Sequence, residues 1–86
     1  MRGQVSVVTG GGRGLGRAFA QALAAAGSLV AVAARSAAEI AETVALIESA
    51  GGKAHAVTTD VTDAGGVDRT FAEIERSLGP IDLLVN

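Results

Sequence analysis

Short apolar runs alternate along this chain with segments in which apolar residues recur every three or four positions. A short run rich in β-branched side chains is typical of a β-strand, and a recurrence of three to four positions is typical of an amphipathic helix. The pattern predicts four strands, at residues 4–9, 29–34, 54–58 and 81–85. The run at 29–34, LVAVAA, contains no polar residue, which predicts a strand that is covered on both faces.

The three intervals between these strands show helical spacing. A capping box formed by Ser36 and Glu39 predicts the start of the second helix, and glycines at positions 27, 51–52 and 79 predict where the helices end. The apolar stripes are, in chain order, Leu15, Phe19, Ala22, Leu23 and Ala26; Ile40, Val44 and Ile47; and Val67, Phe71, Ile74 and Leu78.

Strands that alternate with helices through short turns indicate consecutive βαβ units. Such units form a parallel α/β sheet with right-handed crossovers, and ligands bind beyond the carboxyl ends of its strands. Since the sequence contains no linker, repeat or low-complexity segment, we predict one unit over residues 1–86 and no second domain.

Composition narrows the class of protein. The 86 residues include no cysteine and a single histidine, His55, to which we assign no function; disulfides and a metal site are therefore not expected. The uncharged stretch at 18–34 is rich in alanine and contains Gln21 and Gly27, which indicates helix, turn and strand and not a membrane span. With no apolar targeting segment after Met1, we predict a cytoplasmic protein that does not bind membranes.

The charges are unevenly distributed. Residues 1–38 carry four arginines and no acid, whereas residues 39–86 carry three basic and nine acidic side chains. A positive half without an aromatic platform suits a small anionic ligand better than it suits nucleic acid. Arg2 and Arg17 are expected to be ordinary solvated side chains.

The stretch VTGGGRGLGRA, residues 8–18, lies where the first strand meets the first helix. The N–H groups at a helix start have no partner within the helix, and a glycine turn lets a phosphate approach them without meeting a Cβ. The turn matches neither the G-x-G-x-x-G fingerprint nor the Gly-Lys-Ser/Thr phosphate loop of nucleoside triphosphatases. It nevertheless predicts a phosphate-binding turn.

Three motifs in the same order resemble those of the short-chain dehydrogenase/reductase family. They are Thr9-Gly10-x-x-x-Gly14-x-Gly16, Asp60-Val61-Thr62 after the third strand, and Leu84-Val85-Asn86 at the end of the fourth. The resemblance spans essentially the whole chain. It implies the N-terminal part of a Rossmann-type dinucleotide-binding domain, incomplete, with strand order 3-2-1-4.

The resemblance also implies roles for individual residues. Gly10, Gly14 and Gly16 would permit the turn, the approach to the pyrophosphate and the packing of helix on strand. Asp60 would accept a hydrogen bond from the adenine amino group beside the Val61 backbone, although Asp60 could equally cap the third helix. Asn86 would lie near the adenosine ribose. The cofactor-binding residues implied are Thr9, Gly10, Gly12, Arg13, Gly14, Leu15, Gly16, Arg35, Ser36, Asp60, Val61 and Asn86.

The end of the second strand predicts which cofactor is bound. Sites for NAD place an acidic side chain there to hold the ribose hydroxyls, but this chain has Ala34 followed by Arg35. An arginine can form charge-assisted hydrogen bonds with a 2′-phosphate. We therefore predict NADP over NAD, with Arg35 and Arg13 as phosphate partners and Ser36 as a hydroxyl donor; the alternative for Arg35 is an exposed residue before a helix.

The family transfers a hydride between nicotinamide and a carbonyl or alcohol with a serine, a tyrosine and a lysine. This chain has no tyrosine, and its one lysine, Lys53, matches no catalytic position, so we assign it no catalytic residue and expect it to be inactive alone. The resemblance implies an oxidoreductase acting on a small carbonyl or alcohol, and a homo-oligomer, for the intact protein. A non-catalytic dinucleotide-binding or interaction module is the alternative, and the residues that follow Asn86 would distinguish the two.

Overall fold

A computed structural model describes residues 3–10, 12, 14–59 and 64–85. In this part of the chain four strands form one parallel sheet, as the sequence pattern predicts, and their order β3-β2-β1-β4 is the one that the resemblance implies. The elements are β1 (Val5–Thr9), α1 (Gly14–Ala25), β2 (Leu29–Ala34), α2 (Ala37–Ser49), β3 (Lys53–Thr58), α3 (Ala64–Leu78) and β4 (Leu83–Val85).

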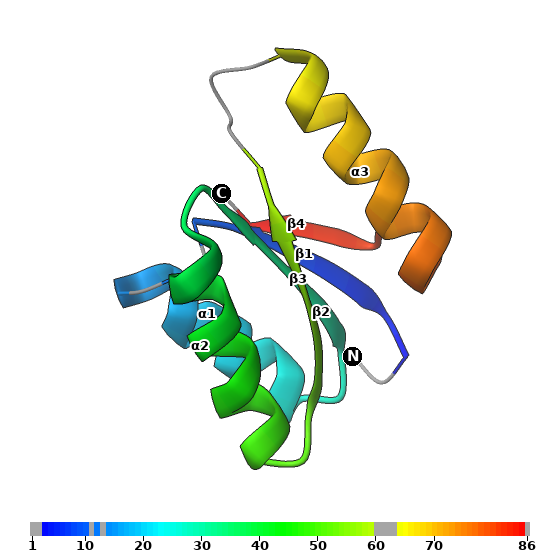
Figure 1. Cartoon of the computed structure of the whole chain (residues 1–86). Coiled ribbons are helices and arrows are strands. Elements are labelled where there is room, and N and C mark those ends of the chain that lie inside the picture. The colour runs from blue at the N-terminus through cyan, green and yellow to red at the C-terminus, as the bar shows by residue number, and fades with distance from the viewer. Residues whose placement is uncertain (1–2, 11, 13, 60–63, 86) are drawn as a thin grey trace.

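The sheet is the middle of three layers. Helices α1 and α2 lie on one face and α3 lies on the other (Figure 1). This arrangement follows from the strand order, because the crossovers from β1 to β2 and from β2 to β3 run in one direction, whereas the crossover from β3 to β4 returns past β1. The carboxyl ends of β1 and β2 therefore meet at one edge, beside the start of α1.

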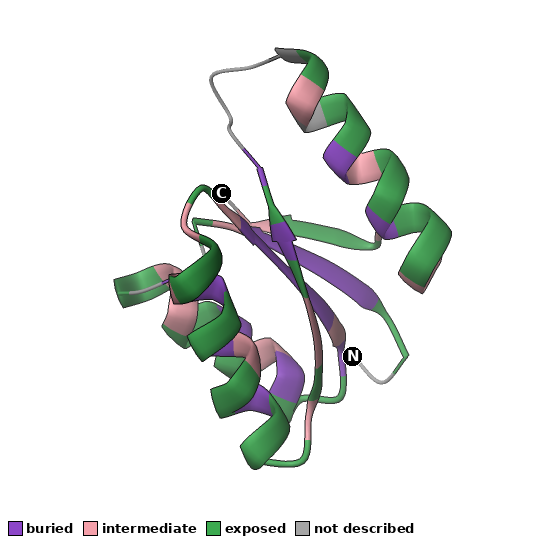
Figure 2. Cartoon of the chain, viewed as in Figure 1, coloured by how far each residue is buried: buried purple, intermediate pink, exposed green. Residues whose placement is uncertain are grey.

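Two apolar clusters hold the layers together. Burial is concentrated in the central strands β1 and β2, which have neighbours on both sides (Figure 2). Burying a valine or isoleucine side chain contributes about 1.5–3 kcal/mol, so these clusters dominate the stability of the fold. The cluster under α1 and α2 contains Val8, Ala20, Ala24, Val30, Val32, Ile40 and Ile47, and the cluster under α3 contains Val5, Val7, Ala31, Val57 and Ile74.

The buried face of α1 differs from the expected stripe. Leu15 and Phe19 are exposed, at 72% and 45%, whereas Ala20 and Ala24 are buried. The two alanines have only a methyl group, so they let the helix axis lie close to the sheet, a position that the larger side chains cannot occupy. The predicted helix is confirmed, and Leu23 of the expected stripe packs against the core, but Leu15 and Phe19 do not lie on the buried face.

The strand β4 is shorter than predicted, and its start has a physical cause. The Asp82 amide donates to the carbonyl of Val5 at 2.8 Å, while the Asp82 carboxylate accepts from the amide of Val5 at 2.8 Å. Since the Val5 N–H is bound by a side chain, regular backbone pairing begins one residue later, at Ser6 with Leu83.

None of the helices in the described ranges combines the length and apolar character needed to cross a membrane.

Candidate cofactor-binding site

The glycine turn leaves the sheet at the end of β1. The Thr9 hydroxyl donates to the carbonyl of Val85 at 3.3 Å, and the Gly10 amide donates to the carbonyl of Ala33 at 2.8 Å. The turn is therefore held to both neighbours of β1. Because Gly10 is anchored to β2, the start of the turn is held next to the end of that strand.

Two glycines of the turn combine an unusual backbone conformation with open surroundings. Gly10 has a φ of 70° and Gly14, the first residue of α1, has a φ of 62°. L-residues rarely adopt these angles. Apart from each glycine's own chain neighbours and helix backbone, no heavy atom of the described residues lies within 4 Å of the position that a Cβ would take at Gly10 or Gly14, which leaves room for a ligand on that side.

Gly12 is required for a different reason, which is steric. It is buried, and a Cβ added to it would lie 2.9 Å from the Cβ and 3.1 Å from the Oε2 of Glu39. The turn thus packs directly on the first turn of α2. The sequence placed Gly12 in the site but did not predict this contact.

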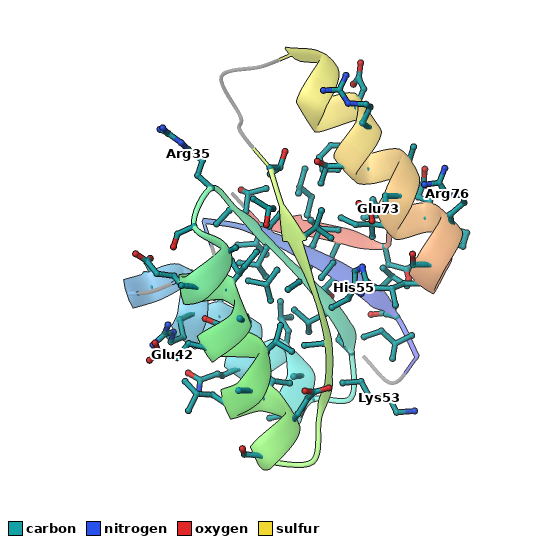
Figure 3. The ribbon with its side chains drawn as sticks, in the orientation of Figure 1. Arg35, Glu42, Lys53, His55, Glu73 and Arg76 are labelled. Atoms are coloured by element: carbon teal, nitrogen blue, oxygen red, sulfur yellow. The ribbon has the colours of Figure 1, made fainter. Side chains whose placement is uncertain are left out.

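Arg35, directly after β2, places a positive charge at the edge of the space outside the glycine turn. Arg35 is exposed and points away from the body of the protein (Figure 3). With the residues that the structure describes, its guanidinium forms no hydrogen bond or ion pair. Ser36 is the N-cap of α2, and its hydroxyl oxygen accepts from the Glu39 amide at 3.3 Å. The Ser36 hydroxyl hydrogen is not used by this bond, so it can still be donated to a ligand.

A cavity of about 300 Å³ joins the glycine turn to the end of β2. Its lining combines small apolar residues with a few polar groups, as is typical of ligand sites. The carboxylate residue Glu39 was predicted as a helix cap only, and the sequence did not place it in the site. The lining residues are Gly10, Gly12, Ala33, Ala34, Arg35, Ser36, Glu39 and Thr59.

A second, larger cavity of about 510 Å³ lies between the end of β3 and α3. Its lining includes Arg69, Glu73 and Arg76 but no residue of the glycine turn. Gly66 near the start of α3 also lines it, but the cavity is separate from the glycine turn after β1 and from the start of α1, where the sequence predicts phosphate binding. We therefore place the candidate site at the smaller cavity.

Arg17 does not have the solvated side chain that the sequence led us to expect. Its side chain is 21% exposed, and it bridges the glycine turn and α2. Nη2 donates to the carbonyls of Gly12 and Glu39, Nε donates to the Thr43 hydroxyl at 2.9 Å, and Nη1 pairs with Glu42 at 3.1 Å. No motif signalled this role, because three of its four acceptors belong to α2, more than twenty positions away.

The other predicted site residues divide into two groups. Leu15 and Gly16 lie in the first turn of α1, where Leu15 is exposed and Gly16 is half-buried. Predictions for Arg13, Asp60, Val61 and Asn86 fall on positions outside the described residues.

Comparisons with known proteins are consistent with this geometry. A profile of the short chain dehydrogenase family matches residues 4–86. The short-chain dehydrogenase/reductase homolog YusS of Bacillus subtilis (strain 168) is 42% identical over 84 residues, which cover 96% of this chain and 77% of that protein.

Two solved structures are similar over nearly the whole chain. The citronellol catabolism dehydrogenase AtuB of Pseudomonas aeruginosa PAO1 has a TM-score of 0.98 and 36% identity, over 100% of this chain and 36% of that one. A metagenomic short-chain oxidoreductase in complex with NADP has a TM-score of 0.94 and 31% identity, over 98% of this chain and 38% of that one. The chain spans about a third of the length of most of the curated relatives that it matches. The profile match, the strand order and the glycine turn after β1 together show that this chain belongs to the short-chain dehydrogenase family.

Proposed function

We propose that this chain forms the NADP(H)-binding part of an oxidoreductase that transfers a hydride between nicotinamide and a carbonyl or alcohol. The main observation in favour of NADP is the positive charge of Arg35, directly after β2. Arg35 lines the cavity beside the glycine turn, and the preceding position, where a site for NAD places an acid, is Ala34.

The residues present fit the adenosine and diphosphate end of such a cofactor. The space at Gly10 and Gly14 lies beside the amides that begin α1, which have no partner within the helix, and this combination suits a diphosphate. Arg35 and the Ser36 hydroxyl would hold a 2′-phosphate, and the cavity would take the adenosine ribose between them. When bound, the nicotinamide would donate the hydride to a carbonyl or accept it from an alcohol, and these residues would bind and orient the cofactor.

Acid–base chemistry on the substrate is not assigned to any residue of this chain. Lys53 begins β3, at the opposite edge of the parallel sheet from the glycine turn, and Figure 3 shows it far from Arg35. We propose that the serine, tyrosine and lysine typical of the family act from sequence other than these 86 residues. A homo-oligomer and a cytoplasmic location remain predictions for the intact protein.

The test of this proposal compares the two cofactors on the natural full-length protein. We expect NADP(H) to bind at least tenfold more tightly than NAD(H), since a charge-assisted hydrogen bond contributes about 1.5–3 kcal/mol and 1.4 kcal/mol corresponds to tenfold. Dissociation constants measured by titration calorimetry give the ratio. Equal affinities, or tighter binding of NAD(H), would contradict the NADP assignment.

A hydride-transfer assay separates the enzyme from the alternative, a non-catalytic dinucleotide-binding module. With NADPH and a panel of aldehydes and ketones, we expect oxidation of the reduced nicotinamide, followed by its absorbance. Tight binding without turnover on any member of the panel would favour the module instead.

Replacing Glu39 by glutamine is expected to strengthen NADP binding by about two- to fivefold and to leave NAD binding nearly unchanged. Glu39 lines the same cavity as Arg35, so its carboxylate repels a 2′-phosphate, and solvent-screened charge interactions of this kind are worth about 0.2–1 kcal/mol. Glutamine keeps the size of the side chain and removes only its charge. Titration of both cofactors against the variant checks the prediction, and weaker binding of NADP would show that the carboxylate has another role.

A further inference from the structure

The contacts of Arg17 join two parts of the candidate site that are separate in sequence. The guanidinium reaches the Gly12 carbonyl in the glycine turn, and it also reaches the Glu39 carbonyl and the Thr43 hydroxyl in the first half of α2. Helix α2 begins immediately after Arg35 and Ser36. Arg17 therefore connects the turn that would hold the diphosphate to the element that follows the 2′-phosphate contacts.

Thr43 makes this connection in a fully buried position. Its side chain is 0% exposed, its hydroxyl accepts from Arg17, and that hydroxyl lies 3.3 Å from the carbonyls of both Gly12 and Glu39. A hydroxyl has one hydrogen, so it can donate to either carbonyl but not fully to both. Water cannot easily replace these bonds at a buried position, which makes them costly to lose.

The guanidinium of Arg17 contacts other groups of the protein and does not line the cavity. Its remaining terminal nitrogen pairs with Glu42, and Arg17 is not among the residues that line the cavity. Figure 3 shows Glu42 on the side of α2 that faces α1, away from Arg35. A direct contact of Arg17 with the cofactor phosphate is thus not part of this arrangement.

We propose that Arg17 is a positioning residue for cofactor binding: it fixes the glycine turn against α2, so that the diphosphate contacts and the contacts at the end of β2 are held at a set separation. The inference rests on the proposed function only in that the site binds a dinucleotide. Because both NAD and NADP contain the diphosphate, it does not depend on which of the two is preferred.

Arginine suits this role better than lysine. The four acceptors, two carbonyls, one hydroxyl and one carboxylate, are reached by three different nitrogens of one planar group. A lysine ammonium is a single point on a flexible stem and cannot reach acceptors on both segments in the same way. Keeping the positive charge with lysine should therefore not restore the function.

The test uses ligands that contact different parts of the site, titrated against the natural full-length protein. Adenosine 2′-monophosphate has the 2′-phosphate but no diphosphate, whereas NADP and NAD contain the diphosphate. We expect Arg17→Gln and Arg17→Lys to weaken both dinucleotides about tenfold and to change the affinity for adenosine 2′-monophosphate less than threefold. Arg76→Gln, which removes the same charge from an exposed position on α3, is the matched control and should change none of the three.

A loss of stability alone would not produce this difference between ligands. If Arg17 only stabilised the fold, the unfolding temperature would fall while the dissociation constants of the folded protein stayed the same. Dinucleotide affinities within twofold of the unsubstituted protein, or an equal loss for adenosine 2′-monophosphate, would overturn the proposal. Thr43→Val, which removes one buried hydroxyl, provides a milder variant if the arginine variants do not fold, with an expected three- to fivefold loss that is again confined to dinucleotides.

The unsubstituted protein separates this inference from the proposed function. If it binds NAD and NADP equally and the Arg17 variants still weaken both, the NADP assignment fails and the positioning role stands. If it binds neither dinucleotide, both are wrong.

Discussion

Replacing Arg35 by aspartate is expected to weaken NADP binding by about a hundredfold or more and to make NAD the preferred cofactor. The substitution removes charge-assisted hydrogen bonds worth about 1.5–3 kcal/mol, and it adds a carboxylate that repels the 2′-phosphate. The guanidinium is exposed and forms no bond with the described residues, so its loss should leave the fold intact. An aspartate in this region can also accept hydrogen bonds from the ribose hydroxyls of NAD.

Two further variants show how much of this effect comes from each cause. Arg35→Ala removes the attraction without adding repulsion, so we expect a loss of about ten- to a hundredfold for NADP and little change for NAD. Arg76→Asp reverses a charge on α3, on the opposite face of the sheet, and should affect neither cofactor. Dissociation constants for both cofactors on the full-length variants give the result. An affinity of Arg35→Asp for NADP within threefold of the unsubstituted protein would mean that Arg35 does not contact the 2′-phosphate.

The order of strands and helices could be read from the sequence because each element carries its own signal. The run at 29–34 is apolar throughout because β2 has a strand on each side and a helical layer on each face. Positive φ angles at Gly27, Gly51 and Gly79 coincide with the predicted ends of the three helices. These signals are local, so they need no knowledge of the tertiary arrangement.

Features that depend on tertiary contacts could not be predicted from the sequence. Spacing alone predicted an apolar stripe on α1 that begins with Leu15 and Phe19, but both are exposed. The buried positions are Ala20 and Ala24, because the helix lies close to the sheet. The bidentate contact of Asp82 with Val5 joins residues 77 positions apart, which no sequence period reveals.

In the candidate site, too, features that are local in sequence were predicted and contacts between distant residues were not. The glycine turn could be predicted because its own residues carry the signal, and the Ser36 cap could be predicted because it bonds a residue three positions away. The bonds of Arg17 to Thr43 and of Thr43 to Gly12 span 26 and 31 positions. They exist only because the crossover from β1 to β2 brings α2 against the turn, so the sequence indicated an ordinary surface arginine instead.

Replacing Gly12 by alanine is expected to lower the free energy of unfolding by about 2 kcal/mol and to weaken dinucleotide binding. The new Cβ would lie 2.9 Å from the Glu39 Cβ, which is fixed to the helix backbone and cannot move away as the end of a flexible side chain could. Overpacking of a well-packed contact typically costs about 1–3 kcal/mol. Relief requires the turn to move away from α2, which would also lengthen the bonds of the Gly12 carbonyl to Arg17 and Thr43.

The cause of this effect can be isolated with a second substitution. Glu39→Gly removes the clashing Cβ at a cost of about 1 kcal/mol for glycine in a helix. In the double variant the two losses should not add, and the coupling free energy should be at least about 1 kcal/mol, measured by denaturant unfolding of the full-length protein. Gly51→Ala is the control for backbone strain, because Gly51 has a φ of 89° but open space at its Cβ position. It lies away from the site, so the substitution should leave dinucleotide affinity unchanged. Additive losses in the double variant would contradict a steric contact between the turn and α2, and with it the view that the turn is held by close packing on this helix.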